Sequence, residues 1–144
     1  NVMTNSPSFK SHIRRLNKYM DLDNLEDFNS SKDLPGGYDP VSRFIKAFYL
    51  NKMNVKSNNY KEALSHSYSI LAAMAMPKGF VRNKKYNHTT YTRYICVYDS
   101  KNKLLTVKSD TNPMVYKLGF EDIEEENKRQ EFFLDTDFIT EKLK

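Results

Sequence analysis

The chain has 144 residues, a mass of 17.0 kDa and a net charge of +5, with 39% hydrophobic and 28% charged residues. Ten Tyr and nine Phe supply enough apolar surface for the core of a single domain, which excludes collagen-like and disordered classes. The longest apolar run, residues 70–76, is far shorter than the roughly 20 residues of a membrane helix, so we expect a soluble protein.

The start of the chain predicts that it belongs to a longer polypeptide. Residues 1–5 read Asn-Val-Met-Thr-Asn, with neither an initiator Met nor a signal-peptide pattern. The single Cys96 cannot form an internal disulfide, which is consistent with a reducing cytoplasm.

The first predicted helix follows residues 1–4, which are compatible with the end of a strand. Ser6 is a suitable N-cap, Pro7 suits the first helical position, and apolar residues at helical spacing continue to Met20. The polar residues 21–33 are then expected to form a loop or an irregular segment.

Two further helices are predicted after the breaker Leu-Pro-Gly-Gly at residues 34–37. The second helix has Asp39 as its cap and an apolar stripe over residues 40–50. The third starts at Asn59, with Glu62 at the spacing of a capping box.

The second half of the chain has the composition of antiparallel strands. Residues 89–98 and 103–108 are rich in Thr, Tyr, Ile and Val and flank a turn at residues 99–102, which predicts a β-hairpin. Residues 114–118 predict another short strand, and residues 131–134 a last one. The fold class expected is therefore α+β, with helices in the first half and antiparallel strands in the second.

Metal and thiol chemistry have little support in the sequence. His12, His66 and His88 have no second ligand at a recognised metal spacing, so surface or packing roles are expected. Cys96 lies in an apolar strand, where alternation predicts a place inside the sheet and the behaviour of a small hydrophobic residue. No nucleotide-binding or serine-hydrolase motif is present.

Two polar residues are candidates for chemistry. Asn5 lies between the first strand-like residues and a helix start, where its amide can donate to an oxyanion or serve as a helix cap. Arg43 lies in the first turns of the second helix and can hold a carboxylate, position a nucleophile or be a surface residue. A cation is slightly unfavourable at a helix N-terminus, which suggests a local purpose for Arg43.

A basic, Tyr-rich stretch offers an alternative function. Tyrosines interleaved with Lys and Arg over residues 82–93 can stack on bases while contacting phosphates. Strand-forming aromatic residues flanked by solubilising charge explain the same pattern.

Two segments resemble motifs of a known family. Residues 1–7 (NVMTNSP) and 34–47 (LPGGYDPVSRFIKA) are similar, in their residues and in their order along the chain, to motifs of the choloylglycine hydrolases. This family includes bile salt hydrolases and penicillin V acylases. The resemblance is strong to about residue 92 and corresponds only to the C-terminal half of a family member.

The resemblance implies part of an αββα sandwich, the fold of N-terminal nucleophile hydrolases. It implies that residues 1–144 are the C-terminal half of one such domain, and that an N-terminal Cys nucleophile lies in a half absent from this chain. Asn5 matches the family Asn of the oxyanion hole, and Arg43 matches the family Arg that supports the nucleophile. Neither Asn1 nor Cys96 can replace the nucleophile.

We therefore expect the C-terminal part of a cysteine-nucleophile hydrolase of linear amides, acting on conjugated bile salts or penicillin V-like acyl amides and inactive alone. The expected partners are a small acyl amide substrate, the missing N-terminal half and further copies in a homo-oligomer, with no nucleic acid and no membrane. A cytoplasmic location and no metal or other cofactor are expected. The alternatives are a non-catalytic homologue that binds an acyl ligand or a protein, and a basic module that binds anions or nucleic acid.

Overall fold

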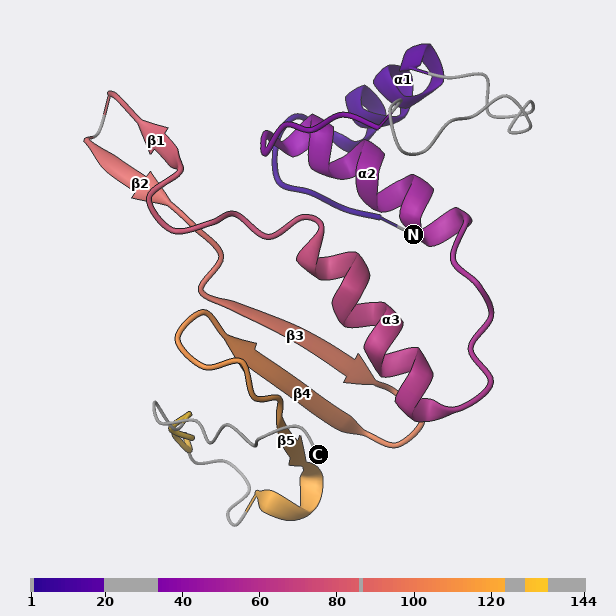
Figure 1. The fold of residues 1–144 in the computed structure, drawn as a ribbon, viewed down its shortest axis with the longest axis vertical. Coiled ribbons are helices and arrows are strands. Elements are labelled where there is room, and N and C mark those ends of the chain that lie inside the picture. The colour runs from indigo at the N-terminus through magenta and orange to yellow at the C-terminus, as the bar shows by residue number, and fades with distance from the viewer. Residues whose placement is uncertain (1, 20–33, 86, 124–128, 135–144) are drawn as a thin grey trace, which may run out of the picture. The chain divides into compact units, whose positions relative to one another are not determined.

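The computed structural model describes residues 2–19, 34–85, 87–123 and 129–134, and the structural statements below concern these residues. The chain divides into two compact units, Asn1–Thr90 and Tyr91–Lys144, called here the first and the second unit. The first unit contains three helices and a short hairpin, and the second contains a three-stranded sheet (Figure 1). No helix in these ranges is both long enough and apolar enough to cross a bilayer.

The three helices of the first unit are α1 (Phe9–Tyr19), α2 (Pro40–Lys52) and α3 (Tyr60–Ala72). Helix α2 confirms the prediction, because Asp39 accepts hydrogen bonds from the backbone N–H groups of Val41 (3.0 Å) and Ser42 (3.1 Å). The cap of α3 is also confirmed, since Asn59 accepts from the N–H of Glu62 at 2.9 Å. The Glu62 carboxylate reaches back to the N–H of Asn58 at 2.7 Å.

The predicted start of the first helix is wrong by two residues. The carbonyl of Ser8 accepts the first helical hydrogen bonds, from the N–H groups of Ser11 and His12, so α1 begins at Phe9 rather than at Pro7. The Ser6–Pro7 peptide bond is cis. The segment before it is not in a strand, contrary to the expectation for residues 1–4.

The core of the first unit forms between α1 and α2. Leu16, Phe44, Ile45 and Tyr49 are at most 4% exposed, and the half-buried Val2, Ile13, Leu34, Val41 and Phe48 pack around them. The rings of Phe9 and Phe44 form a T-shaped pair, with centroids 6.0 Å apart. This packing places the N-terminal segment and the first turn of α2 next to each other.

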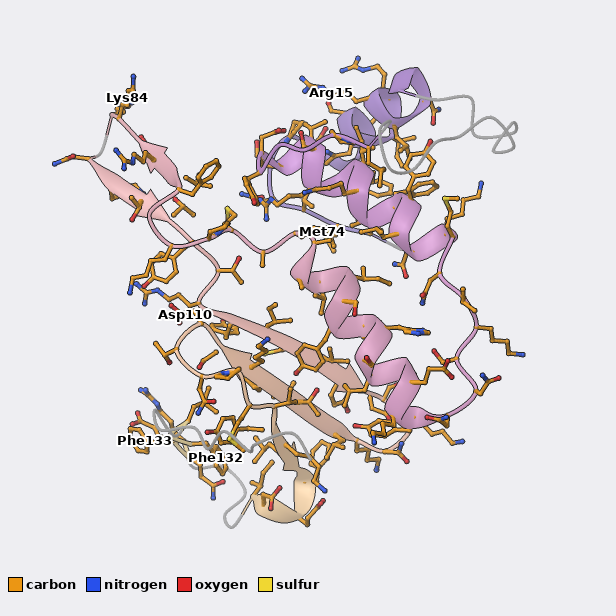
Figure 2. The ribbon with its side chains drawn as sticks, viewed as in Figure 1. Arg15, Met74, Lys84, Asp110, Phe132 and Phe133 are labelled. Carbon is orange, nitrogen blue, oxygen red and sulfur yellow. The ribbon has the colours of Figure 1, made fainter. Side chains whose placement is uncertain are left out.

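The hairpin of the first unit was not predicted as a separate element. Strands β1 (Val81–Asn83) and β2 (His88–Thr90) pair antiparallel, and Lys84 lies at their tip (Figure 2). The single strand expected over residues 89–98 is therefore wrong, because its first residues pair with β1 and the ladder is interrupted before Tyr94.

The second unit is a meander of β3 (Tyr94–Asp99), β4 (Leu104–Ser109) and β5 (Tyr116–Gly119), followed by the short 3₁₀ helix Phe120–Asp122. The hairpin of β3 and β4 confirms the prediction, and Asp99 closes its turn by accepting from the N–H groups of Lys101 and Asn102. Residues 131–134 are not in a strand, so that prediction is wrong.

The cap of α2 predicts how the protein responds to acid. The Ser42 hydroxyl, with the N–H groups of Ser42 and Val41, holds the pKa of Asp39 below its ordinary value of 3.8, and partial burial opposes this. The stability contributed by the carboxylate is therefore present above pH 3.8 and lost as the pH falls through the lower folded value.

We expect Asp39→Ala to lower the free energy of unfolding by about 1 kcal/mol at pH 7, measured by urea unfolding. The matched control Asp39→Asn keeps a capping oxygen but cannot ionise, so it should retain most of this stability and lose its acid dependence. An unchanged unfolding midpoint in Asp39→Ala would show that the cap contributes nothing.

Candidate functional site

The structure brings together the two candidate residues, Asn5 and Arg43, which are 38 positions apart in the sequence. Asn5 lies on the segment before α1, and Arg43 lies in the first turn of α2, where its backbone N–H bonds the Asp39 carbonyl at 3.0 Å. Arg43 Nη2 donates to Asn5 Oδ1 at 2.9 Å.

This hydrogen bond determines the orientation of the Asn5 amide. A guanidinium group only donates, so the atom of Asn5 that faces it must be the oxygen. The Nδ2 group of Asn5 is then a donor on the other side of the amide, and none of the described residues accepts from it. Because Asn5 is exposed, this N–H pair is open to an incoming acceptor.

Arg43 is half-buried and is only partly satisfied. Its Nε is buried and has no hydrogen-bond partner among the described residues. Buried polar atoms are nearly always paired, so an exception of this kind is typical of a functional or strained position.

A second cation lies one helical turn away from Arg43. Lys46 Nζ donates to the Ala73 carbonyl at 3.0 Å, just beyond the end of α3, and lies 5.4 Å from the centroid of the Tyr38 ring. Burial lowers the pKa of Lys46 from its ordinary value of 10.5, the positive charge of Arg43 lowers it further, and Asp39 opposes the shift. The start of α2 is therefore a positively charged corner.

The other groups considered in the sequence do not form a site. No three His, Cys, Asp or Glu side chains within the described ranges are grouped so as to hold a metal ion. His12 is buried, as a packing role predicts, and His66 bonds the Ser57 hydroxyl at 3.1 Å. The basic Lys84 and Arg82 lie exposed on the β1–β2 hairpin, far in the sequence from Asn5.

The placement predicted for Cys96 is wrong, because this residue is exposed. It shares a face of the sheet with Tyr94 and Tyr98, which are 64% and 58% exposed, and burial of part of the thiol still raises its pKa from the ordinary 9.0. Alternation along β3 is correct, but the face with Ile95 and Val97 is the more buried one.

The exposed face of the second unit is apolar. A hollow of about 520 Å³ lies over it. Its lining includes Tyr94, Cys96, Leu105, Val107, Tyr116 and Leu118, together with Phe132 and Phe133, which are labelled in Figure 2.

The sequence reasoning missed two residues beside the candidate pair. Thr4 and His12 form hydrogen bonds that connect the Asn5 segment to both α1 and α2. A threonine and a histidine in the sequence do not by themselves indicate such hydrogen bonds, which are seen only from the distances in the folded chain.

The contact between Asn5 and Arg43 predicts a coupling that stability measurements can detect. A double-mutant cycle of Asn5→Ala and Arg43→Met should give an interaction free energy of about 1 kcal/mol in urea unfolding. The matched cycle of Asn5→Ala with Arg15→Ala should be additive, because Arg15 extends from α1 away from α2 (Figure 2). Equal coupling in both cycles would contradict a specific contact.

Comparison with known proteins assigns the family. Residues 1–129 match the family described as linear amide C-N hydrolases, choloylglycine hydrolase family. The chain is 32% identical to the conjugated bile acid hydrolase of Lactobacillus gasseri, over 78% of this chain and 44% of that protein. It is 30% identical to the bile salt hydrolase/transferase of Clostridium perfringens, over 67% of this chain and 34% of that protein.

Solved structures agree with the sequence relatives. Penicillin V acylase from Agrobacterium tumefaciens superimposes with a TM-score of 0.67 at 28% identity, over 85% of this chain and 36% of that one. A mutant of the conjugated bile acid hydrolase from Clostridium perfringens gives 0.71 at 22% identity, over 92% and 45%. This confirms the expected α+β fold class, part of the N-terminal nucleophile hydrolase fold of these enzymes.

The chain spans less than half the length of the curated relatives it matches. Its sequence match, its fold and the two motifs at residues 1–7 and 34–47 all lead to the same assignment. The chain belongs to the choloylglycine hydrolase family of linear amide C–N hydrolases.

Proposed function

We propose that this chain is the C-terminal part of a cysteine-nucleophile hydrolase that cleaves conjugated bile acids or penicillin V-like acyl amides. The hydrogen bond from Arg43 to Asn5 carries the proposal, because it leaves the Asn5 Nδ2 group exposed as a donor beside a positively charged corner. Family membership supports an amide as the substrate.

The reaction follows from the family resemblance. The thiol of an N-terminal Cys, outside these 144 residues, attacks the carbonyl carbon of the amide, and the α-amino group of that Cys takes the proton. The C–N bond of the tetrahedral intermediate breaks, the amine leaves with a proton, and a thioester remains. Water then hydrolyses the thioester to the free acid.

In this proposal Asn5 contributes to the oxyanion hole. The carbonyl oxygen gains negative charge as the thiolate attacks, and the Nδ2 group of Asn5 donates to it. A donor that is already oriented in the ground state costs no reorganisation during the reaction. Arg43 supplies that orientation through the 2.9 Å contact with Asn5 Oδ1.

Arg43 also acts on the nucleophile in this proposal. A neighbouring cation favours the thiolate over the thiol, and the thiolate is the attacking species. Lys46 adds to the same positive potential, although its Nζ is occupied by the Ala73 carbonyl.

The remaining N-terminal half of the domain is the proposed partner that covers the apolar sheet face. The chain spans 44% of the length of the Lactobacillus gasseri conjugated bile acid hydrolase. One face of the three-stranded sheet presents tyrosine, leucine and valine side chains around Cys96. A second antiparallel sheet on this face completes the sandwich. A homo-oligomeric state and a cytoplasmic location belong to the same proposal.

Substitution of Asn5 tests the proposed role of its amide. In the complete protein, Asn5→Ala should lower kcat for penicillin V or glycocholate about 10²- to 10³-fold, with a smaller change in KM. Release of the amine product is the measurement. The exposed Asn17→Ala on α1 is the matched control and should keep wild-type kcat. Wild-type turnover by Asn5→Ala would refute the role of Asn5, and hydrolysis by the isolated 144 residues would refute the need for the missing half.

Alkylation of Cys96 tests the proposed cover of the sheet face. Iodoacetamide should modify Cys96 in the isolated chain at a rate that rises with pH through and beyond 9.0, because burial raises the thiol pKa. In the complete protein the native rate should fall steeply, while both forms react equally in urea. Mass spectrometry of the peptide that contains Cys96 distinguishes alkylation of this thiol from alkylation of other thiols. Equal native rates would mean that nothing covers this face.

A further inference from the structure

Thr4 is the residue directly before Asn5, and its hydroxyl connects three parts of the first unit. Thr4 Oγ1 lies 3.1 Å from Nε2 of His12 on α1 and donates to the carbonyl of Pro40, the first residue of α2, at 3.0 Å. Pro40 is three residues before Arg43. The segment that carries Asn5 is thus bonded to both helices one residue away from the candidate site.

The chemistry of these groups determines the direction of each hydrogen bond. A threonine hydroxyl has one hydrogen, and a carbonyl oxygen only accepts, so the hydrogen of Thr4 points to Pro40. Toward His12 the Thr4 oxygen can then only accept. Nε2 of His12 must therefore carry a hydrogen, which in the neutral ring is the Nε2–H tautomer.

The surroundings of His12 fix its ring in this role. The residue is 1% exposed, and its ring stacks on Phe44 with centroids 4.6 Å apart and planes 9° from parallel. Nδ1 is buried and has no hydrogen-bond partner among the described residues, so the bond to Thr4 is the one polar contact found there for the ring. The ring also contacts the residue next to Arg43 on α2.

We propose that Thr4 and His12 are positioning residues of the candidate site. His12 donates to the Thr4 hydroxyl and thereby directs its hydrogen to Pro40, and these two bonds hold Asn5 against the first turn of α2. Held there, Asn5 Oδ1 meets Arg43 Nη2 and the Nδ2 group stays exposed as a donor. The effect on catalysis rests on the proposed function, whereas the hydrogen-bond arrangement itself does not.

A purely structural role of Thr4 makes a different prediction. If the hydroxyl only stabilised the fold, its loss would lower the unfolding midpoint and leave turnover by the folded enzyme unchanged. If it positions Asn5, its loss changes kcat and the environment of the Asn5 amide even where the protein stays folded. A displacement of about 1 Å in such a group can cost about 10²-fold in rate.

The first test uses the wild-type protein and needs no variant. The ¹⁵N and ¹H NMR signals of the His12 ring in the complete protein should show hydrogen on Nε2, and on Nε2 alone if the ring is neutral. Hydrogen on Nδ1 with a bare Nε2 would overturn the proposal, because the bond to Thr4 would then have no donor.

The second test compares four variants of the complete protein. Thr4→Val keeps the shape but removes both hydrogen bonds, and it should lower kcat by about 10- to 100-fold with KM nearly unchanged. Thr4→Ser keeps the hydroxyl and should restore kcat. His12→Gln keeps an N–H donor near the position of Nε2, and its kcat should lie between those of Thr4→Val and Thr4→Ser. Arg15→Ala, on the exposed side of α1, is the control with wild-type kcat.

The outcomes separate this inference from the proposed function. If the wild-type protein hydrolyses no amide, the proposed function fails, and the His12 tautomer and the shift of the Asn5 amide signals in Thr4→Val still decide the inference. If Thr4→Val is folded and keeps wild-type kcat and wild-type Asn5 signals, Thr4 is not a positioning residue.

Discussion

The buried ring of Phe44 sets the direction in which Arg43 points. Phe44 is 1% exposed, its ring stacks on that of His12, and it forms a T-shaped pair with the ring of Phe9. Successive residues of an α-helix are separated by about 100° around its axis. Once Phe44 is inserted between α1 and α2, rotation of α2 is fixed, and Arg43 is held at the border of the core toward Asn5. The geometry of the pair is thus a consequence of core packing.

The helix caps of the first unit could be predicted because their signals are local. Asp39 and Asn59 each accept from backbone groups two or three residues ahead, and such contacts depend on few other residues. The β3–β4 hairpin could likewise be predicted from the sequence, since Asp99 forms its turn with residues two and three positions later. The start of α1 was misplaced because Ser6 and Ser8 are both acceptable caps, and only the folded chain distinguishes them.

What could not be predicted depends on contacts between distant residues. The pairing of Asn5 with Arg43 crosses 38 positions. Local position made each residue a candidate and the family resemblance named both, but neither predicted the contact between them. Alternation along β3 places Cys96 and Val97 on opposite faces of the sheet, but it does not predict which of the two faces is buried. Strand β1 has three residues that are mostly exposed, so it has no apolar alternation to detect. The donor role of His12 toward Thr4 follows only from the position of Pro40.

The cap of α2 also determines the electrostatic potential at the candidate site. Asp39 is the acidic group whose charge is felt by Lys46, and its oxygens are already engaged by Val41 and Ser42. Arg43 and Lys46 therefore outnumber the carboxylate at a helix end where the backbone dipole is itself positive. An acceptor that gains negative charge beside Asn5 is lowered in energy there, whereas a neutral carbonyl is affected much less. The positively charged corner therefore favours the charged acceptor over the neutral carbonyl through electrostatics alone, independently of shape complementarity.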